Sequence, residues 1–297
     1  MRKEYTGHIL KGIGGFYYVE ASGQRYECKA RGLFRKQKMT PYAGDMVRIG
    51  VDEDESATIL EILPRGNSLT RPPVANLDQL VIVVSTCDPA PSTLMIDKIV
   101  AIAEDKSIDP IVVFSKTDLQ SAETLIKIYR HAGLRVYAVP AAGTQEDIRG
   151  LLPEKLTAFT GNSGVGKSTL LNALFPDLAL QTGEISQKLG RGRHTTRAVE
   201  LYPVEGGYVA DTPGFSTLDI ERYEMVQKDN LQFAFREFAP YLTKCKFTSC
   251  AHIKETGCAV LDAVRAGDIE ASRHESYVYM YNEVKDIKEW SLPQSDR

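Results

Sequence analysis

The sequence predicts a multidomain protein with an N-terminal β-barrel, a central α/β domain and a C-terminal, mostly helical domain. Three observations lead to this prediction. Short segments that alternate polar and apolar residues fill residues 1–66, apolar strands alternate with helical patterns over residues 67–218, and three of the five cysteines crowd into residues 219–297. With 297 residues, of which 43% are hydrophobic and 25% charged, the chain has the composition of a globular protein of two or three domains.

Three features of the sequence argue against a membrane or secreted protein. The longest purely aliphatic run, residues 80–84, is far too short to cross a bilayer, and residues 1–19 lack the apolar stretch of a signal peptide. The cysteines are odd in number and clustered, which favours a metal site in a reducing compartment over a disulfide framework. We therefore expect a cytoplasmic protein without a membrane segment.

Five short, strand-like segments separated by Gly, Pro and acidic turns predict the barrel. They are residues 7–10, 16–19, 25–28, 46–49 and 58–62. A five-stranded OB-fold is the natural candidate, and such barrels bind oligonucleotides; an SH3-like barrel would show much the same pattern. Residues 1–50 hold ten basic and four acidic residues, a net charge of +6 in a chain whose net charge is −3. This basic lobe fits a face that binds a polyanion such as RNA, although a solvated surface would look the same.

Apolar strands that alternate with helical patterns predict the central domain, since this alternation produces a mostly parallel sheet covered on both faces. Ligands of such domains bind beyond the carboxyl ends of the strands, where Ser115, Gly161 and Asp211 are expected. The predicted strands are residues 80–84, 110–114, 136–139, 156–159 and 208–210, and the predicted helices are residues 94–104 and 122–132.

A phosphate-binding loop is predicted between the strand at 156–159 and an apolar helical run at 170–174. Its glycines allow a tight turn whose backbone N–H groups converge on phosphates, and the following helix directs its positive dipole end at them. Ser168 at the start of that helix can bind Mg²⁺. A glycine turn without a ligand is the alternative interpretation. The predicted phosphate-binding residues are Gly161, Asn162, Ser163, Gly164, Val165, Gly166, Lys167, Ser168 and Thr169.

The tetrapeptide Ser115-Lys116-Thr117-Asp118 is a candidate base-reading motif at the end of a strand. The Asp118 carboxylate can accept hydrogen bonds from both the N1–H and the 2-amino group of guanine, whereas adenine offers neither donor. The stem of Lys116 can lie across the base, and Ala141 or Ala142 can offer a backbone N–H to the guanine O6. By itself the tetrapeptide would be an ordinary loop, but its place in this domain favours a guanine site.

The order of these motifs predicts a circular permutation. A metal and switch element, Asp211-Thr212-Pro213-Gly214, follows the phosphate loop as expected for a guanine-nucleotide switch, but the base-reading motif comes before that loop instead of last. Permutation is feasible because the termini of compact domains often lie close together. We predict that Asp211 and Gly214 complete the GTP-binding site.

Residues 188–197 form a glycine-rich, basic segment without an apolar period, which predicts a loop. Thr196 is the candidate Mg²⁺ ligand that senses the γ-phosphate. His194 is the candidate catalytic residue, because Phe215 stands where a water-orienting glutamine is usual. An exposed basic loop, with His194 at the surface or on RNA, is the alternative.

Cys245, Cys250, His252 and Cys258 predict a structural zinc centre, because three thiolates and an imidazole complete a tetrahedral set and leave no position for a substrate. Buried cysteines without a metal are the alternative. Helices are expected at residues 230–242 and 269–290. Four aromatic side chains of this region could stack on RNA bases or belong to a helix core: Tyr277, Tyr279, Tyr281 and Trp290.

Together these features resemble one family, the ribosome small-subunit-dependent GTPases called RsgA, also known as YjeQ or YloQ. The resemblance rests on the permuted order, the segment from Gly190 to Arg197, the element Asp211-Thr212-Pro213-Gly214-Phe215 and the cysteine–histidine set, and it covers nearly the whole chain. It implies an OB-fold, a permuted GTPase domain and a zinc domain. It also implies late action on the small ribosomal subunit, GTP hydrolysis that the subunit accelerates, contact with rRNA, and binding of ppGpp.

Ser115 and Pro140 depart from the family's usual motifs. The predicted function is GTP hydrolysis during late assembly of the small ribosomal subunit, with GTP or GDP, Mg²⁺ and one Zn²⁺ as ligands and a monomer as the expected form. Two other classes stay open: an RNA-binding assembly module with negligible nucleotide turnover, and a P-loop ATPase or kinase.

Overall fold

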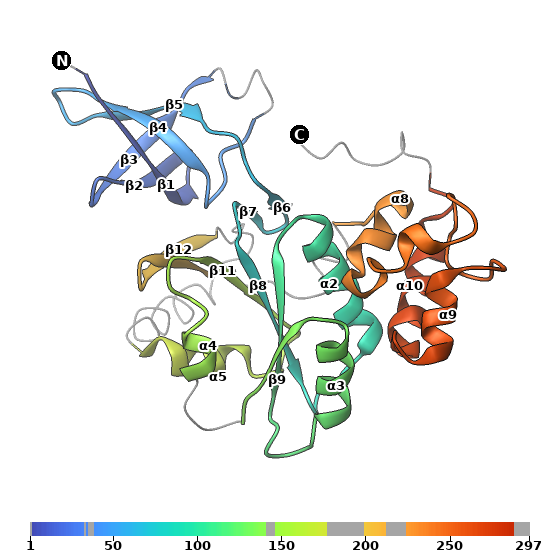
Figure 1. Ribbon diagram of the computed structural model, residues 1–297. Helices are drawn as coiled ribbons and strands as arrows, with labels where there is room; N and C mark the ends of the chain where they lie inside the picture. The colour runs from blue at the N-terminus through green and yellow to red at the C-terminus, as the bar shows by residue number, and fades with distance from the viewer. Residues whose placement is uncertain are drawn as a thin grey trace.

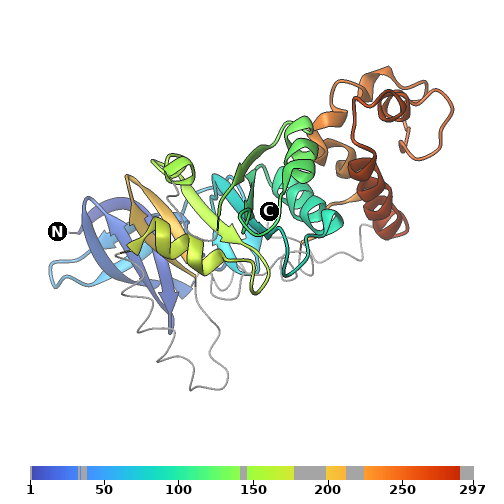
Figure 2. The same cartoon turned by 90° about the horizontal axis from the view of Figure 1, so that it is seen from below.

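A computed structural model describes residues 2–32, 34, 39–140, 146–176, 199–211 and 224–287, with Asp211 described by its backbone alone. Figures 1 and 2 show three parts, with the N-terminal barrel and the C-terminal helices at opposite ends of the central domain. This arrangement confirms the predicted fold class. Within the described ranges, no helix is both long enough and apolar enough to span a bilayer.

The N-terminal barrel closes through five strands. Strand β1 pairs with both β2 and β4, β2 with β3, β3 with β5 in parallel, and β5 with β4, which completes the ring. Residues that alternate along these strands fill its core, and Ile9, Val19 and Ile49 are fully buried there. The predicted barrel is thereby confirmed. Its strands are β1 (Lys3–Ile13), β2 (Phe16–Ala21), β3 (Gln24–Ala30), β4 (Met46–Val51) and β5 (Ala57–Ile62).

The central sheet runs in the order β10-β9-β8-β11-β13-β12, and only β12 is antiparallel to its neighbour. All seven residues of β8 are buried because helices cover both faces of the sheet. A buried Val, Leu or Ile is worth about 1.5–3 kcal/mol, so β8 anchors the domain. The strands are β8 (Gln79–Ser85), β9 (Asp109–Ser115), β10 (Arg135–Ala138), β11 (Leu156–Thr160), β12 (Glu200–Val204) and β13 (Gly207–Asp211).

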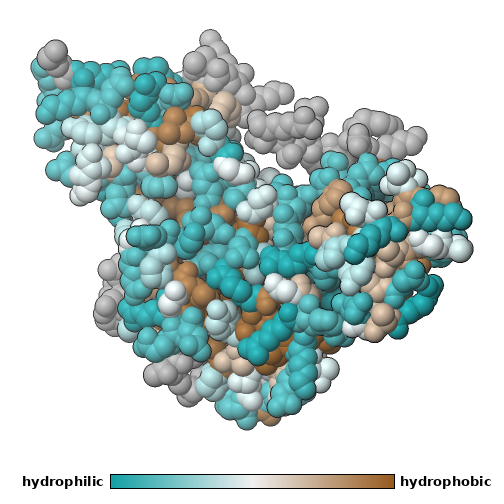
Figure 3. Space-filling view, in the orientation of Figure 1, coloured by the Kyte–Doolittle hydropathy of each residue, from teal (hydrophilic) through white to brown (hydrophobic). Residues whose placement is uncertain are grey.

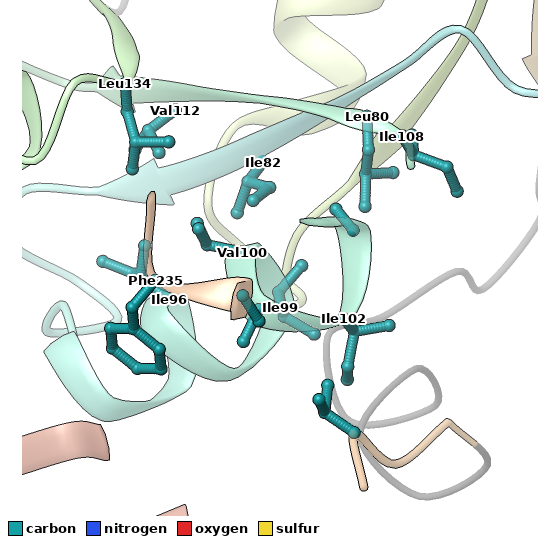
Figure 4. Packing of buried hydrophobic residues seen from close by; sticks show 14 of the residues in the cluster. Leu80, Ile82, Ile96, Ile99, Val100, Ile102, Ile108, Val112, Leu134 and Phe235 are labelled. Atoms are coloured by element: carbon teal, nitrogen blue, oxygen red, sulfur yellow. The ribbon is translucent and has the colours of Figure 1, made fainter. Parts of the chain in front are cut away.

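Alternate residues of β8 belong to two different cores. Leu80 and Ile82 pack with α2 and α3 on one face, whereas Val81 and Val83 pack with α4 and α5 on the other. Figure 4 shows Leu80 and Ile82 facing the apolar side of α2, with Phe235 from the C-terminal part beside that helix. The helices are α2 (Thr93–Asp105), α3 (Glu123–His131), α4 (Glu146–Arg149) and α5 (Lys167–Leu174).

Sequence patterns did not predict β12 or the junction that it makes. β12 contains a proline and pairs antiparallel at the edge of the parallel sheet, so it lacks the long apolar run of its neighbours. Lys11 of β1 pairs with Glu200 of β12, and the barrel and the central sheet thus form one 11-stranded sheet. A small hairpin, β6 (Ser68–Thr70) and β7 (Pro73–Ala75), lies between the two parts. The domain limits at 66 and 218 stay predictions.

The C-terminal part is helical, as expected, but the predicted helix at 230–242 is wrong. Helix α8 is only four residues long, and three 3-10 turns follow it, because Phe235 adopts an extended conformation that interrupts the helix. Residues 288–290 of the predicted 269–290 helix lie outside the described residues. The elements are α8 (Lys228–Leu231), η1 (Gln232–Ala234), η2 (Arg236–Phe238), η3 (Leu242–Lys244), α9 (Ala259–Ala266) and α10 (Ala271–Val284).

A candidate nucleotide site and a candidate metal centre

The predicted phosphate loop lies between β11 and α5, at the carboxyl edge of the sheet. Gly164 and Gly166 have φ angles of 82° and 90°, in the left-handed region that favours glycine. A Cβ atom at Gly161 would lie 2.6 Å from the Val83 carbonyl oxygen. These three glycines are therefore needed for the turn, and the turn places the amino end of α5 at the place where an anion would sit.

Ser115 connects the candidate base-reading motif to the phosphate loop. Its side chain is 5% exposed, and its hydroxyl oxygen lies 2.5 Å from the Val165 carbonyl oxygen and 3.3 Å from that of Val84. A hydroxyl has one hydrogen to donate, and the shorter distance favours Val165. The Ser115 hydroxyl therefore reaches the phosphate loop, although Ser115 departs from the usual motif.

A loop that follows β8 supports Lys116. Sequence patterns did not identify this loop. The Thr86 hydroxyl donates to the Lys116 carbonyl oxygen at 2.8 Å, and the Lys116 ammonium donates to the Asp88 carbonyl oxygen. Lys116 has a φ of 58°, a strained conformation that these contacts help to hold. One signal could have indicated this loop. It follows the carboxyl end of β8, which lies between β9 and β11, and ligands of such sheets bind beyond those ends.

Other predicted residues of the nucleotide site that the structure describes follow β9 or begin α5. The Asp118 side chain is exposed, and the Thr117 N–H donates to the Val139 carbonyl oxygen at 3.3 Å. In the first turn of α5, Lys167 is half-buried whereas Ser168 and Thr169 are exposed. Carboxyl, ammonium and hydroxyl groups thus stand along one edge of the sheet, as a nucleotide site requires.

Several predicted site residues cannot be placed in this geometry. Ala141, His194, Thr196 and Gly214 lie outside the described residues. Asp211 is the last residue of β13, and the preceding Ala210 pairs with Ala158 of β11. The Asp211 backbone therefore ends at the same edge as the phosphate loop.

The four predicted metal ligands come together in the C-terminal part. The ligand atoms of Cys245, Cys250, His252 and Cys258 all lie within 4.8 Å of one another. The His252 Nδ1 atom is 3.6 Å from the Cys245 sulfur and 3.4 Å from the Cys258 sulfur, and these two sulfurs are 4.0 Å apart. Sulfur atoms placed tetrahedrally at ~2.3 Å from a Zn²⁺ ion are about 3.8 Å apart, so the residues fit that ion.

Groups around the cluster fix its ligands. The His252 Nε2 atom lies 3.0 Å from the Gln232 Oε1 atom, an acceptor that requires the proton on Nε2 and leaves Nδ1 free to bind a metal. Burial raises the pKa of the Cys250 thiol to about 12, so a cation is needed to hold it as a thiolate at neutral pH. Burial opposes ionisation of Glu255, but hydrogen bonds from backbone N–H groups lower its pKa overall and tie down the ligand loop.

The aromatic side chains proposed for RNA stacking have different environments. Tyr277 is 1% exposed and packs edge-on against Phe235 and Phe238, so it belongs to the helix core. Tyr279 is 49% exposed, and Trp290 lies outside the described residues. On the barrel, the Lys29 ammonium lies 5.6 Å from the centre of the exposed Phe16 ring. Hydrophilic side chains cover most of the barrel face seen in Figure 3.

Comparisons with known proteins agree with this architecture. The RsgA N-terminal domain matches residues 6–59 and the RsgA GTPase domain matches residues 62–221. Proteins called small ribosomal subunit biogenesis GTPase RsgA are similar over most of their length. The relative from Caldanaerobacter subterraneus subsp. tengcongensis is 43% identical over 94% of this chain and 96% of its own. The relative from Geobacillus thermodenitrificans is 44% identical over 95% of this chain and 98% of its own.

Two crystal structures also match. YloQ, described as a circularly permuted GTPase, superposes with a TM-score of 0.79 and 35% identity over 99% of this chain and 98% of its own. YjeQ from Thermotoga maritima superposes with a TM-score of 0.80 and 34% identity over 96% of this chain and 100% of its own. The motif order, the fold and the three kinds of comparison lead to one conclusion: the chain belongs to the RsgA family of circularly permuted, GTP-hydrolysing enzymes.

Proposed function

We propose that this protein hydrolyses GTP on the small ribosomal subunit during late assembly, and that the bound subunit accelerates hydrolysis. The observation that carries the proposal is the 2.5 Å contact of Ser115 with the Val165 carbonyl oxygen. It joins a base-reading motif and a phosphate loop that come in permuted order. The small ribosomal subunit is proposed as the partner because similar proteins are called small ribosomal subunit biogenesis GTPases.

In the proposed complex, the loop from Gly161 to Gly166 would surround the phosphates with backbone N–H groups, and Lys167 would neutralise their charge. Ser168 and Thr196 would hold Mg²⁺, which supplies charge stabilisation for the transferred phosphoryl group. Asp211 and Gly214 would complete the site beside them. The exposed hydroxyl of Ser168 and the end of β13 at this edge support these assignments.

Guanine selection would depend on the Asp118 carboxylate, because it accepts two hydrogen bonds that only guanine can donate. The Lys116 stem would cover the base, and Ala141 would offer its N–H to the guanine O6. The alarmone ppGpp carries the same base and a 5′-diphosphate, so we expect it to compete with GTP for this site.

The hydrolytic step needs a water molecule aligned with the γ-phosphate. Phe215 cannot orient a water, and we assign this role to His194. An imidazole can accept a proton from the water or hold it in place near neutral pH. Free protein is therefore expected to hydrolyse GTP slowly, and subunit binding would bring His194 into position.

Two further sites would support binding to the subunit. The barrel offers exposed aromatic and basic side chains, including Phe16 and Lys29, which suit stacking and phosphate contact with rRNA. One Zn²⁺ held by the three cysteines and His252 would stabilise the C-terminal part without touching the nucleotide. We expect the protein to act as a monomer.

Turnover of GTP and ATP, each with and without purified small subunits, tests this function. The proposal predicts GTP turnover that rises when subunits are added and little ATP turnover. Absent turnover with intact subunit binding would support an RNA-binding assembly module instead. Preferential ATP turnover would support a P-loop ATPase.

A further inference from the structure

We propose that the ion pair between Lys11 and Glu200 is the positioning link through which a ligand on the barrel acts on the GTP site. The inference rests on the proposed function, in which the subunit binds the barrel and accelerates hydrolysis. The pair joins the barrel to the central domain, whose core also takes Leu10 from barrel strand β1. Its role would be to set the position of β12 and β13, and with them Asp211.

Strand β1 belongs to both parts of the molecule. Its first half, from Lys3 to His8, pairs with β4 inside the barrel. A bulge then falls between Ile9 and Lys11 in the pairing with β2. Bulges redirect side chains. Here Ile9 fills the barrel core, whereas Leu10 joins the core of the central domain together with Leu201 of β12.

Three residues line up across the strands beyond the bulge. Lys11 of β1 pairs with Glu200 of β12, and Glu200 pairs with Asp211 of β13. The Lys11 ammonium lies 2.7 Å from the Glu200 carboxylate, and the two side chains are 21% and 26% exposed. Partial burial reduces screening by water and salt, so this pair is stronger than a fully exposed one. One strand therefore separates the barrel from the backbone of Asp211.

A second contact connects the barrel with β13 itself. The Tyr208 hydroxyl donates to the Glu20 carboxylate of β2 at 3.1 Å, and the rings of Tyr208 and His8 lie 5.2 Å apart. Burial and the Glu20 carboxylate raise the pKa of Tyr208 to about 12, so its hydroxyl stays a donor at neutral pH. Tyr208 lies three residues before Asp211 in the same strand.

The described pairing of β1 with β12 is short, so a single side chain can decide how firmly these two strands are held together. Among the described residues, which resume at Val199, one residue pair, Lys11 with Glu200, gives the register of β1 and β12. The barrel has a separate attachment at the connector, where the Ala75 N–H donates to Ala43 and the Asn76 amide donates to Gly44. Loss of the ion pair should thus leave the barrel attached at the connector. It should also let β12 and β13 move more freely relative to the barrel.

The test is the charge reversal Glu200→Lys, which places two ammonium groups at this junction. Subunit-stimulated GTP turnover should fall about fivefold at saturating subunit concentration. Subunit affinity and the rate of the free protein should stay within about twofold of wild type. The matched control is Glu61→Lys, which disrupts a 2.7 Å ion pair with Arg48 that lies wholly within the barrel and adds the same charge. This control should keep the full stimulated rate.

Adding Lys11→Glu to Glu200→Lys restores opposite charges and should recover most of the stimulated rate, which general destabilisation would not allow. Should the reversal prevent folding, Glu200→Gln with Glu61→Gln as its control should show about a twofold loss confined to the stimulated rate. Full stimulation of the Glu200 variant overturns the inference, as does an equal loss in the Glu61 control. A wild-type protein that subunits fail to stimulate overturns the proposed function, and the inference with it.

Discussion

Replacement of Arg273 by methionine should loosen the C-terminal part from the central domain. Arg273 lies on α10 and is 1% exposed, between two buried carboxylates. Its guanidinium donates to Asp97 of α2 at 2.7 Å and to Glu237 at 2.8 Å, and it lies 4.6 Å from the centre of the Phe235 ring. Asp97 and Glu237 would remain buried without a counter-ion, and breaking such a network costs about 3–5 kcal/mol.

Hydrogen exchange in α10 measures this cost directly, because a multidomain protein need not unfold in one step. A loss of 3–5 kcal/mol corresponds to exchange that is faster by roughly a hundred- to a few thousand-fold. The matched control is Arg265→Met, which removes an exposed ion pair with Asp262 and should change stability by less than about 1 kcal/mol. Unchanged protection of α10 in Arg273→Met would refute this reasoning.

The pH dependence adds a second check. Burial raises the pKa of Asp97, while Arg273 opposes that rise. In the variant, burial still raises the pKa of Asp97, and only the hydrogen bonds with Ser276 and Tyr129 oppose that rise. The folded protein therefore holds a proton that the unfolded chain releases. The loss of unfolding free energy caused by Arg273→Met should therefore be smaller at pH 5.5 than at pH 7.5. Adding Asp97→Asn and Glu237→Gln should recover part of the lost stability by removing the buried charges.

Three further variants test the site assignments. Asp118→Asn should weaken GTP and GDP binding by at least about tenfold and partly admit xanthine nucleotides, because an amide can donate where a carboxylate only accepts; equal wild-type affinity for ATP and GTP would remove the assignment. Cys250→Ser should lower zinc content and the melting temperature of the C-terminal part while sparing GTP affinity, and full metal occupancy would contradict it. His194→Ala should reduce the subunit-stimulated rate by about 10²-fold with little change in GTP affinity; undiminished stimulation would show that another group orients the water.

Features that depend on a short stretch of sequence could be predicted. The phosphate loop needs glycine at fixed positions, and Gly161, Gly164 and Gly166 have the conformations or close contacts that require it. The four candidate metal ligands would have been harder to interpret if dispersed, but Cys245 to Cys258 span a single loop region. Each signal depends on local geometry, and local geometry follows from neighbouring residues.

Features that depend on distant pairing were not predictable. Strand β12 is short and contains Pro203, and its position becomes clear only from its neighbours β13 and β1. The contact of Ser115 with Val165 joins residues 50 positions apart. The burial of Arg273 likewise depends on Asp97, 176 residues away. Charged residues are rarely buried, so sequence alone favours a surface position for them.

The rate of GTP hydrolysis as small subunits are added tests the central claim most directly. With saturating GTP and Mg²⁺, the turnover number should be low for the free protein and should rise and saturate as small subunits are added, while large subunits serve as the control. Added salt should erode the stimulation, because contacts with rRNA phosphates release counterions. Fast hydrolysis by the free protein, or a rate that small subunits leave unchanged, would contradict the account.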